Sequence, residues 1–240
     1  VDNFFIDDNI KFIDSYVGGG SVIAYDSGDF TGTRAYLTGI DNNGDILETW
    51  SGGIRLSSDE NDQFIKGMVQ LSNGYFVIWL DQRSGYGDIY GQMIDVEGNI
   101  LGPEEGIPIA TQVNDQQAPT ISYNDTLNEI IVCWEDFRNG SDFDIYCATI
   151  NGATLEVLDT IDLCVYNGNQ KSPSVYSSLN GAYLFAWEDS RAGVTSDIYY
   201  QSISNNNYDY TDYGIELCSA DFNQFNPKID LYSEINNSYM

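Results

Sequence analysis

The sequence predicts an all-β protein built of repeated four-stranded antiparallel units, arranged as a β-propeller or as an arc of one. Three observations support this fold class. Short runs rich in Tyr, Ile, Val and Phe alternate with turn-forming clusters of Gly, Asn, Asp and Ser. No stretch keeps a helical periodicity over three turns. A tryptophan-centred motif returns at a spacing that suits a propeller blade.

The repeat is carried by three segments, WLDQRSGYGDIY, WEDFRNGSDFDIY and WEDSRAGVTSDIY, which begin at Trp79, Trp134 and Trp187. The tryptophans are therefore 55 and 53 residues apart. A glutamine marker keeps the same period, at positions 63, 117, 170 and 224. Each unit contains four short strands, a content and length that match a kelch-like propeller blade of about 50 residues better than a solenoid coil. In the third unit these strands are expected at about residues 119–123, 129–135, 144–150 and 157–165.

This period divides the chain into four complete units, approximately 8–62, 63–116, 117–169 and 170–223. Residues 224–240 match the first strand of a further unit, and residues 1–7 match a last strand. Together they would form a fifth blade without its two middle strands. We therefore expect one propeller domain over residues 1–240 that belongs to a longer chain. Completion of the fifth blade by a neighbouring subunit is the alternative.

The repeated turn motif is expected to be structural. Two aspartates flank an arginine in every copy, and a guanidinium can hold carboxylates in bidentate fashion and close a long turn. A catalytic arginine is needed once, whereas a turn-closing ion pair is needed in every blade. The tryptophan of each copy is expected to pack between blades. The residues assigned to this structural staple are Trp79, Asp81, Arg83, Asp88, Trp134, Asp136, Arg138, Asp144, Trp187, Asp189, Arg191 and Asp197.

The first unit departs from the repeat, with Tyr25 at the position of the tryptophan. A catalytic site should break a repeat rather than follow it, and propeller glycosidases use carboxylates that project toward the axis. Asp26, Asp29 and Arg34 are the departures that such a site would use. Sequence drift in a terminal blade is the favoured explanation, so no catalytic residue is assigned.

The charge balance excludes several functions. The chain has 37 Asp and Glu against 9 Lys and Arg, no His, and a formal net charge of -28. Such a polyanion repels nucleic acids and anionic lipids. The lack of His excludes His-based catalytic triads and the usual zinc sites. No apolar run is long enough to span a membrane. The chain begins with Val1 rather than Met, which indicates a processed product. We therefore expect an exported protein, extracellular or at the cell surface.

Two oxygen-rich stretches, residues 57–62 and 205–213, are candidates for binding Ca²⁺, the one cofactor that the sequence suggests. Their carboxylates are Asp59, Glu60, Asp62, Asp209 and Asp212. The similar stretch at residues 41–45 matches a repeated hairpin turn instead.

The four cysteines allow more than one arrangement. Cys133 and Cys147 lie symmetrically about a predicted hairpin turn, where opposed residues come within disulfide range. A cross-strand disulfide between them suits an exported protein. A bond between Cys147 and Cys164 is the competing arrangement, and free buried thiols are the third.

The pattern Trp-x-Asp-x-Arg-x-Gly-x-x-Asp-Ile-Tyr resembles the tandem propeller repeats of large secreted and cell-surface proteins of bacteria and archaea. It is more distantly similar to the WD40-like repeats of TolB-type propellers. The resemblance covers nearly the whole chain and implies the propeller fold. It implies no catalytic residue, because propellers host lectins, hydrolases and scaffolds alike.

The function expected from these features is a non-catalytic, extracellular or surface-displayed propeller module for binding or scaffolding, within a larger adhesin-like or filament-forming assembly. Its partners would be other protein subunits or the rest of a longer chain, with a glycan as a further ligand. The alternative is a glycan-active hydrolase or a lectin with its ligand site at the propeller axis. The absence of His, of a nucleophile motif and of a nucleotide loop favours the first function.

Overall fold

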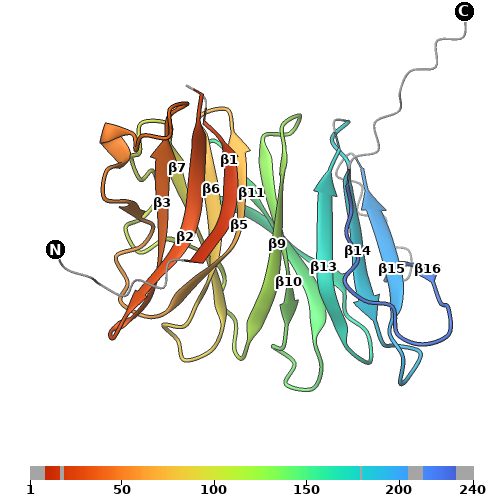
Figure 1. Ribbon diagram of the computed structural model, residues 1–240. Coiled ribbons are helices and arrows are strands. Elements are labelled where there is room, and N and C mark those ends of the chain that lie inside the picture. The colour runs from red at the N-terminus through yellow and green to blue at the C-terminus, as the bar shows by residue number, and fades with distance from the viewer. Residues whose placement is uncertain (1–8, 17–18, 179, 205–212, 231–240) are drawn as a thin grey trace, which may run out of the picture.

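The structure is a computed structural model that describes residues 9–16, 19–178, 180–204 and 213–230. Within this part of the chain the strands form four antiparallel sheets of four strands each, and a single 3-10 turn (Glu48–Trp50) interrupts them. Figure 1 shows the four sheets side by side. The predicted all-β propeller architecture is thus confirmed. No helix in the described residues is long and apolar enough to cross a membrane.

Each sheet is a meander whose strands pair in chain order, and we call the sheets blades 1 to 4. Blade 1 contains β1 (Asn9–Ser15), β2 (Ser21–Asp29), β3 (Gly32–Ile40) and β4 (Ile54–Arg55). Blade 2 contains β5 (Gln63–Leu71), β6 (Gly74–Asp81), β7 (Asp88–Asp95) and β8 (Ile107–Ala110). Blade 3 contains β9 (Gln116–Asn124), β10 (Glu129–Asp136), β11 (Asp144–Asn151) and β12 (Val157–Cys164). Blade 4 contains β13 (Gln170–Ser177), β14 (Tyr183–Asp189), β15 (Asp197–Ile203) and β16 (Ile215–Cys218).

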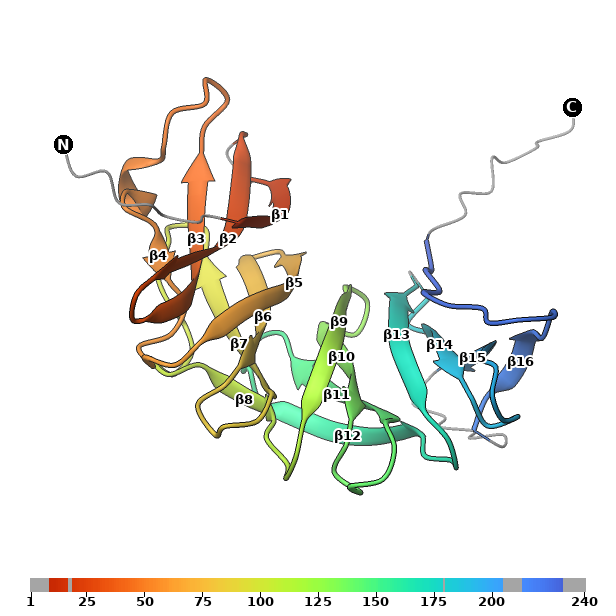
Figure 2. The ribbon, with the colours of Figure 1, turned by 60° about the horizontal axis from the view of Figure 1, so that its bottom comes forward.

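The blades are arranged in an arc, with the first strand of each blade on the inner side (Figure 2). β1 contacts β5, β5 contacts β9, and β9 contacts β13, so these four strands form the inner wall. The outer strands, such as β12 and β16, lie on the far side of their sheets. The inner wall surrounds the position of the propeller axis.

The core lies between blades rather than within them. Three apolar clusters join blade 1 to blade 2, blade 2 to blade 3, and blade 3 to blade 4. In each cluster the repeated tryptophan packs against the preceding blade: Trp79 against blade 1, Trp134 against blade 2 and Trp187 against blade 3. All three indoles are fully buried or nearly so. A four-stranded unit that is apolar on both faces is stable only when its neighbours cover it.

The strand register corrects the position of the repeated glutamine in blade 3. Gln63 pairs with Asp81 and Gln170 with Asp189, but in blade 3 the partner of Asp136 is Gln116. The repeated glutamine is therefore Gln116, and the expected Gln117 was wrong by one residue. With this correction, a proline follows the marker three positions later in blades 3 and 4.

Residues 224–230 continue the repeat beyond blade 4. The backbone N–H of Gln224 donates to the carbonyl of Ser196 at 2.8 Å, and that of Ile229 donates to the hydroxyl of Ser174 at 3.2 Å. This segment, which we call the fifth inner segment, thus lies on blade 4 as each inner strand lies on the preceding blade. The remaining parts expected for a fifth blade, residues 1–7 and 231–240, lie outside the described residues.

Candidate functional site

The repeated turn motif closes on a single aspartate in each blade. In blade 3, the Trp134 indole N–H donates to Asp136 Oδ2 at 2.8 Å, and the Arg138 guanidinium binds both Asp136 oxygens, at 2.9 and 2.6 Å. The guanidinium also lies 3.7 Å from the centre of the Tyr146 ring. Blades 2 and 4 repeat this arrangement with Asp81–Arg83 over Tyr90 and Asp189–Arg191 over Tyr199. The motif is an ion pair combined with a cation–π contact, which fixes the tryptophan and the turn together.

The second aspartate of the motif does not take part in this ion pair, contrary to the expectation that the arginine bridges two carboxylates. Among the described residues, no ion pair joins an arginine to Asp88, Asp144 or Asp197. Asp144 instead accepts a hydrogen bond from the Asn139 amide at 2.8 Å. The first aspartate accepts from the Nε–H and Nη2–H edge of the guanidinium, while the second lies across the hairpin, opposite the first.

Asp144 therefore carries a perturbed carboxyl group. Burial, together with the charge of Asp142, raises the pKa of Asp144 to about 6. Burial likewise raises the pKa of Asp88, at the equivalent position of blade 2. Neither group lines the pocket of the inner wall, so these shifts belong to the turns rather than to a binding site.

Arginines from elsewhere in the chain pair with the acids of the stretch at residues 57–62. Glu60 pairs with Arg34 at 3.2 Å and with Arg55 at 2.9 Å, and the Arg55 hydrogen bond is the main cause of a lowered pKa of Glu60. Asp59 accepts from its neighbour Asn61 and lies 3.8 Å from a guanidinium of the turn motif. The described residues contain no group of three or more acids or cysteines placed to hold a metal ion. The other proposed calcium ligands, Asp209 and Asp212, lie outside the described residues.

The cysteines adopt the cross-strand arrangement. Cys133 and Cys147 are directly opposed in β10 and β11, with a Cα–Cα distance of 4.0 Å, and form a disulfide. Cys164 is a buried thiol and Cys218 an exposed one. Burial and the charge of Asp189 raise the pKa of the Cys164 thiol, which therefore stays protonated and unreactive at neutral pH.

Asp26, from the degenerate first unit, takes part in a different repeated contact that the sequence did not reveal. Its carboxylate accepts the backbone N–H of Ile65, on the inner strand of the next blade, at 2.8 Å. Glu135 accepts from Ser172 at 2.8 Å, and Glu188 accepts in the same way from Asn226. We call this contact the inter-blade clip. It is a structural device, because the same carboxylate position ties one blade to the next.

Arg34, another departure in the first unit, has structural partners. Arg34 is buried and bound to Glu60 and to the carbonyl of Thr33, so it neutralises the acidic stretch. Asp29 ends β2. The clip is absent between blades 2 and 3 of the described chain, where Leu80 stands at the position of Asp26.

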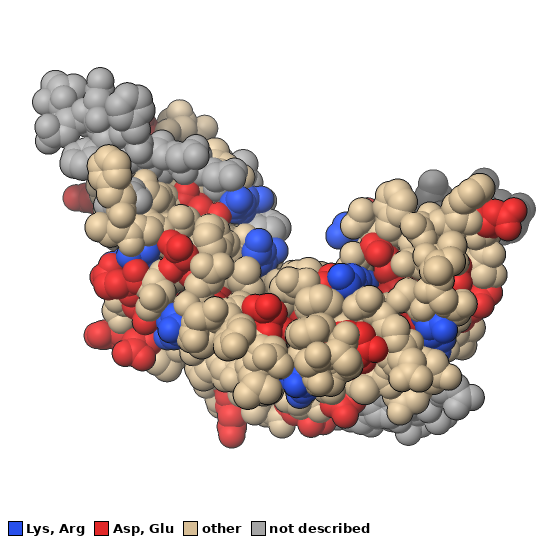
Figure 3. Space-filling view, turned by 90° about the horizontal axis from the view of Figure 1, so that it is seen from below, with Lys and Arg blue, Asp and Glu red and all other residues tan. Residues whose placement is uncertain are grey.

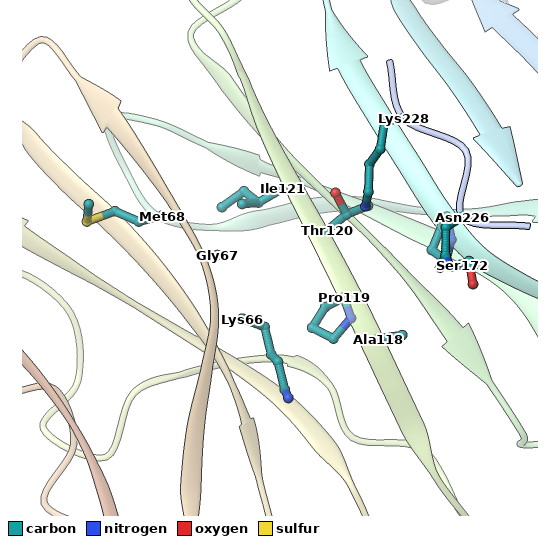
Figure 4. A pocket seen from close by; sticks show the side chains of 11 residues that line it. Lys66, Gly67, Met68, Ala118, Pro119, Thr120, Ile121, Ser172, Asn226 and Lys228 are labelled. Atoms are coloured by element: carbon teal, nitrogen blue, oxygen red, sulfur yellow. The ribbon is translucent and has the colours of Figure 1, made fainter. Parts of the chain in front are cut away.

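A pocket lies on the inner wall, where blades 2, 3 and 4 and the fifth inner segment meet. Its volume is about 450 Å³. β5, β9 and β13 supply most of the lining, and Figure 4 shows how these strands frame it. The lining residues are Lys66, Gly67, Met68, Ala118, Pro119, Thr120, Ile121, Ser172, Pro173, Asn226 and Lys228. We call it the axial pocket.

The axial pocket owes its shape to close packing of the inner strands. A side chain at Gly67 would place its Cβ 2.5 Å from Ile121 Cγ2, so only glycine allows β5 to approach β9 this closely. Ala118, Ser172 and Asn226 have positive φ angles of 48°, 51° and 54°. They form the same backbone bulge in successive units, and in the last two the bulge turns an N–H toward the clip carboxylate.

Sequence reasoning alone does not identify any residue of the axial pocket. A sequence pattern does mark the pocket, but it cannot be recognised while Gln117 is taken as the repeated glutamine. Once Gln116 is the marker, the pattern Gln-x-x-Pro holds at Pro119, Pro173 and Pro227, and Lys66 stands where the proline is expected.

Comparison with protein-family models and with curated proteins finds no match. Comparison with solved structures finds similar folds at low sequence identity. An α-L-arabinanase of Penicillium chrysogenum, solved with arabinobiose, has a TM-score of 0.55 and 14% identity, over 93% of this chain and 68% of that chain. A β-1,2-mannobiose phosphorylase of Listeria innocua, solved with β-1,2-mannobiose, has a TM-score of 0.50 and 8% identity, over 81% of this chain and 71% of that chain. At these identities the likeness establishes the β-propeller fold alone.

Proposed function

We propose that this chain is a carbohydrate-binding β-propeller whose ligand site is the axial pocket. The observation that carries the proposal is the position of this pocket, on the inner wall of a fold shared with two proteins solved with bound disaccharides. Its volume of about 450 Å³ lies within the usual range for small-molecule sites.

The lining suits a sugar. Thr120, Ser172 and Asn226 supply hydroxyl and amide groups that both donate and accept hydrogen bonds. Met68 and Pro119 supply apolar surface for the C–H faces of a pyranose or furanose ring. A few polar groups set in an apolar wall is the usual composition of a ligand site.

Binding without hydrolysis is favoured by what the lining contains. Glycoside hydrolysis by the common mechanisms requires two carboxyl groups about 5 to 9.5 Å apart across the scissile bond. No Asp or Glu is among the described residues that line the axial pocket. Three acids beside the inner strands, Asp26, Glu135 and Glu188, hold backbone N–H groups in the clips.

A glycan-active hydrolase is the second candidate, since the structural neighbours include an arabinanase. These neighbours support a glycan function over a purely scaffolding one. Export to the cell surface and membership of a larger adhesin-like assembly belong to the same proposal, because a glycan-binding propeller fits such a location.

The test is binding of neutral arabino-, xylo- and manno-oligosaccharides by isothermal titration calorimetry, beside a reducing-sugar assay on the corresponding polysaccharides. Binding without sugar release is the expected result. Thr120→Trp should block the pocket and abolish binding, whereas Thr160→Trp, on the exposed outer strand β12, should leave it intact. Urea unfolding of both variants checks that they are folded. Sugar release would move the assignment to a hydrolase, and binding unaffected by Thr120→Trp would place the site elsewhere.

A further inference from the structure

Most basic side chains of this acidic protein have a local partner. Every arginine forms an ion pair with a carboxylate. Lys11 lies 3.3 Å from Asp26, and Lys171 lies 4.6 Å from the centre of the Phe143 ring. Lys66 and Lys228 are the exceptions: neither has an ion pair, hydrogen bond or ring contact with another described residue. Both line the axial pocket.

The environment of Lys66 differs from that of its counterpart in blade 1. By strand register, Lys66 is equivalent to Lys11, since Gly67 and Phe12 hold the next position. Lys11 is neutralised by Asp26 of its own blade. In blade 2 the equivalent of Asp26 is Leu80, so Lys66 has lost the carboxylate that pairs with Lys11.

Lys228 also departs from the repeat. The equivalent position on the inner strands is uncharged in every blade: it is held by Phe12, Gly67, Thr120 and Ser174. Figure 4 shows Lys66 on the β5 side of the pocket and Lys228 on the side of β13 and the fifth inner segment. Two lysines without an ion pair to another described residue, supplied by separate segments, thus line one pocket.

Two lysines at one pocket, neither of them paired with another described residue, are unusual in a protein with this charge. The chain has a formal net charge of -28, and Lys and Arg side chains lie on both walls of the hollow in the arc, with Asp and Glu side chains both beside the hollow and over the outer surface of this view (Figure 3). Charges separated by more than about 8 Å are largely screened at physiological ionic strength. A ligand inside the pocket is therefore affected most by the charges beside it. These are the two lysines and the clip carboxylates of Glu135 and Glu188, each of which already accepts a hydrogen bond from a backbone N–H of the lining.

We infer that the axial pocket binds an acidic saccharide, whose carboxylate or sulfate groups bind Lys66 and Lys228. The inference rests on the proposed carbohydrate-binding function and specifies its ligand class. Each ammonium offers three donors and a full charge, and this suits the anionic groups of such a saccharide. Thr120 and Asn226, beside the lysines in the lining, are then placed to bind the sugar hydroxyls.

The net charge also limits the form of this ligand. A long polyanion would extend beyond the hollow and meet the acidic outer surface, where like charges repel it. The pocket should therefore prefer a short acidic oligosaccharide or a chain end. Salt would weaken both the local attraction and the general repulsion, so amino-acid substitution is a cleaner test than ionic strength.

The experiment compares four probes by isothermal titration calorimetry: tetragalacturonic acid, its fully methyl-esterified counterpart, a sulfated κ-carrageenan tetrasaccharide and neutral arabinotetraose. The acid and its ester differ chiefly in charge. The variants are Lys66→Gln and Lys228→Gln, each of which keeps the side-chain length approximately. Lys171→Gln is the matched control, because Lys171 lies on an inner strand but does not line the pocket. All three lysines are at least partly exposed, and urea unfolding verifies that the variants fold.

The wild-type protein should bind at least one of the two acidic probes about tenfold more tightly than the ester. Each pocket variant should weaken that binding by about fivefold, the upper range for a partly exposed ion pair, and weaken ester binding less. Lys171→Gln should alter neither. The stronger of the two acidic probes identifies carboxylate or sulfate as the preferred group.

Equal affinity for the acidic probes, the ester and arabinotetraose would overturn the inference and leave the carbohydrate-binding function standing. Binding of the acid that Lys171→Gln weakens as much as Lys66→Gln would overturn it too, because the preference would then reflect overall charge. Failure of every probe, neutral and acidic, would overturn both the inference and the proposed function.

Discussion

Replacing Asp144 with Asn should stabilise the protein relative to the wild type, and this gain should increase as the pH rises. Asp144 is 1% exposed, and its Oδ1 atom has no hydrogen-bond partner among the described residues. Its pKa is raised from 3.8 to about 6 by burial and by the charge of Asp142. The folded protein thus holds this proton more tightly than the unfolded chain does.

The sign follows from proton linkage. A carboxyl with a raised folded-state pKa stabilises the fold while it is protonated in both states, below about pH 4. That contribution is lost as the pH rises from about 4 to about 6, because the folded state must then bury a charge. The difference between about 6 and 3.8 is about 2.2 units, and one unit corresponds to about 1.36 kcal/mol. The loss therefore amounts to about 3 kcal/mol.

An asparagine at position 144 cannot titrate, so Asp144→Asn escapes this loss. The free energy of unfolding of both proteins would be measured by urea denaturation at several pH values between about 4 and 7.5, with linear extrapolation. All other acids titrate in both proteins, so subtracting one curve from the other isolates position 144. The variant-minus-wild-type difference should grow by about 3 kcal/mol across this range.

Asp88→Asn provides a companion measurement with the same sign, because burial also raises the pKa of Asp88. A difference that stays constant with pH for Asp144→Asn would refute the reasoning. It would mean that the carboxyl is solvated, or that its charge is neutralised by a partner that the structure does not place there.

Three further predictions concern the contacts between and within blades. Trp134→Ala should lower the free energy of unfolding by about 3 to 5 kcal/mol in urea denaturation, since the indole fills the blade 2–blade 3 core; a loss below about 1 kcal/mol would contradict this packing. Glu135→Ala should cost about 1 to 3 kcal/mol by leaving the Ser172 N–H without its acceptor, and a neutral result would show that the clip carries no stability. Reducing the bond between Cys133 and Cys147, 14 residues apart, should cost about 3 kcal/mol. Adding reductant should lower the urea midpoint of the wild-type protein. It should not change the midpoint of the Cys133→Ser/Cys147→Ser double variant.

Much of the fold could be predicted from the sequence because the same physical problem recurs in every blade. The tryptophan, the first aspartate and the arginine stand close together in the chain and contact each other locally. Their spacing thus reports their structure directly. The four strands of blade 3 were predicted within three residues at either end, since each is bounded by turn-forming residues.

The failures have equally specific causes. The two aspartates of the motif look alike in sequence, and only the hairpin geometry shows that Asp136 reaches Arg138 while Asp144 does not. The clip joins residues 37 to 39 positions apart in adjacent blades, so no local pattern reveals it. The pocket depends on four separate segments, and its lysines become visible as exceptions only after the register is known.

Within each blade, the residues that stabilise the fold are different from those that line the pocket, and this separation affects how the protein can evolve. The contacts that hold a turn closed lie within one unit, and the tryptophan makes the same contact with whichever unit precedes it. A duplicated unit therefore inherits a complete set of structural contacts. The positions of Lys66 and Lys228 face the hollow and carry none of them. Mutation at these positions can alter ligand preference while copying preserves the architecture, so recognition and folding can evolve almost independently in this chain.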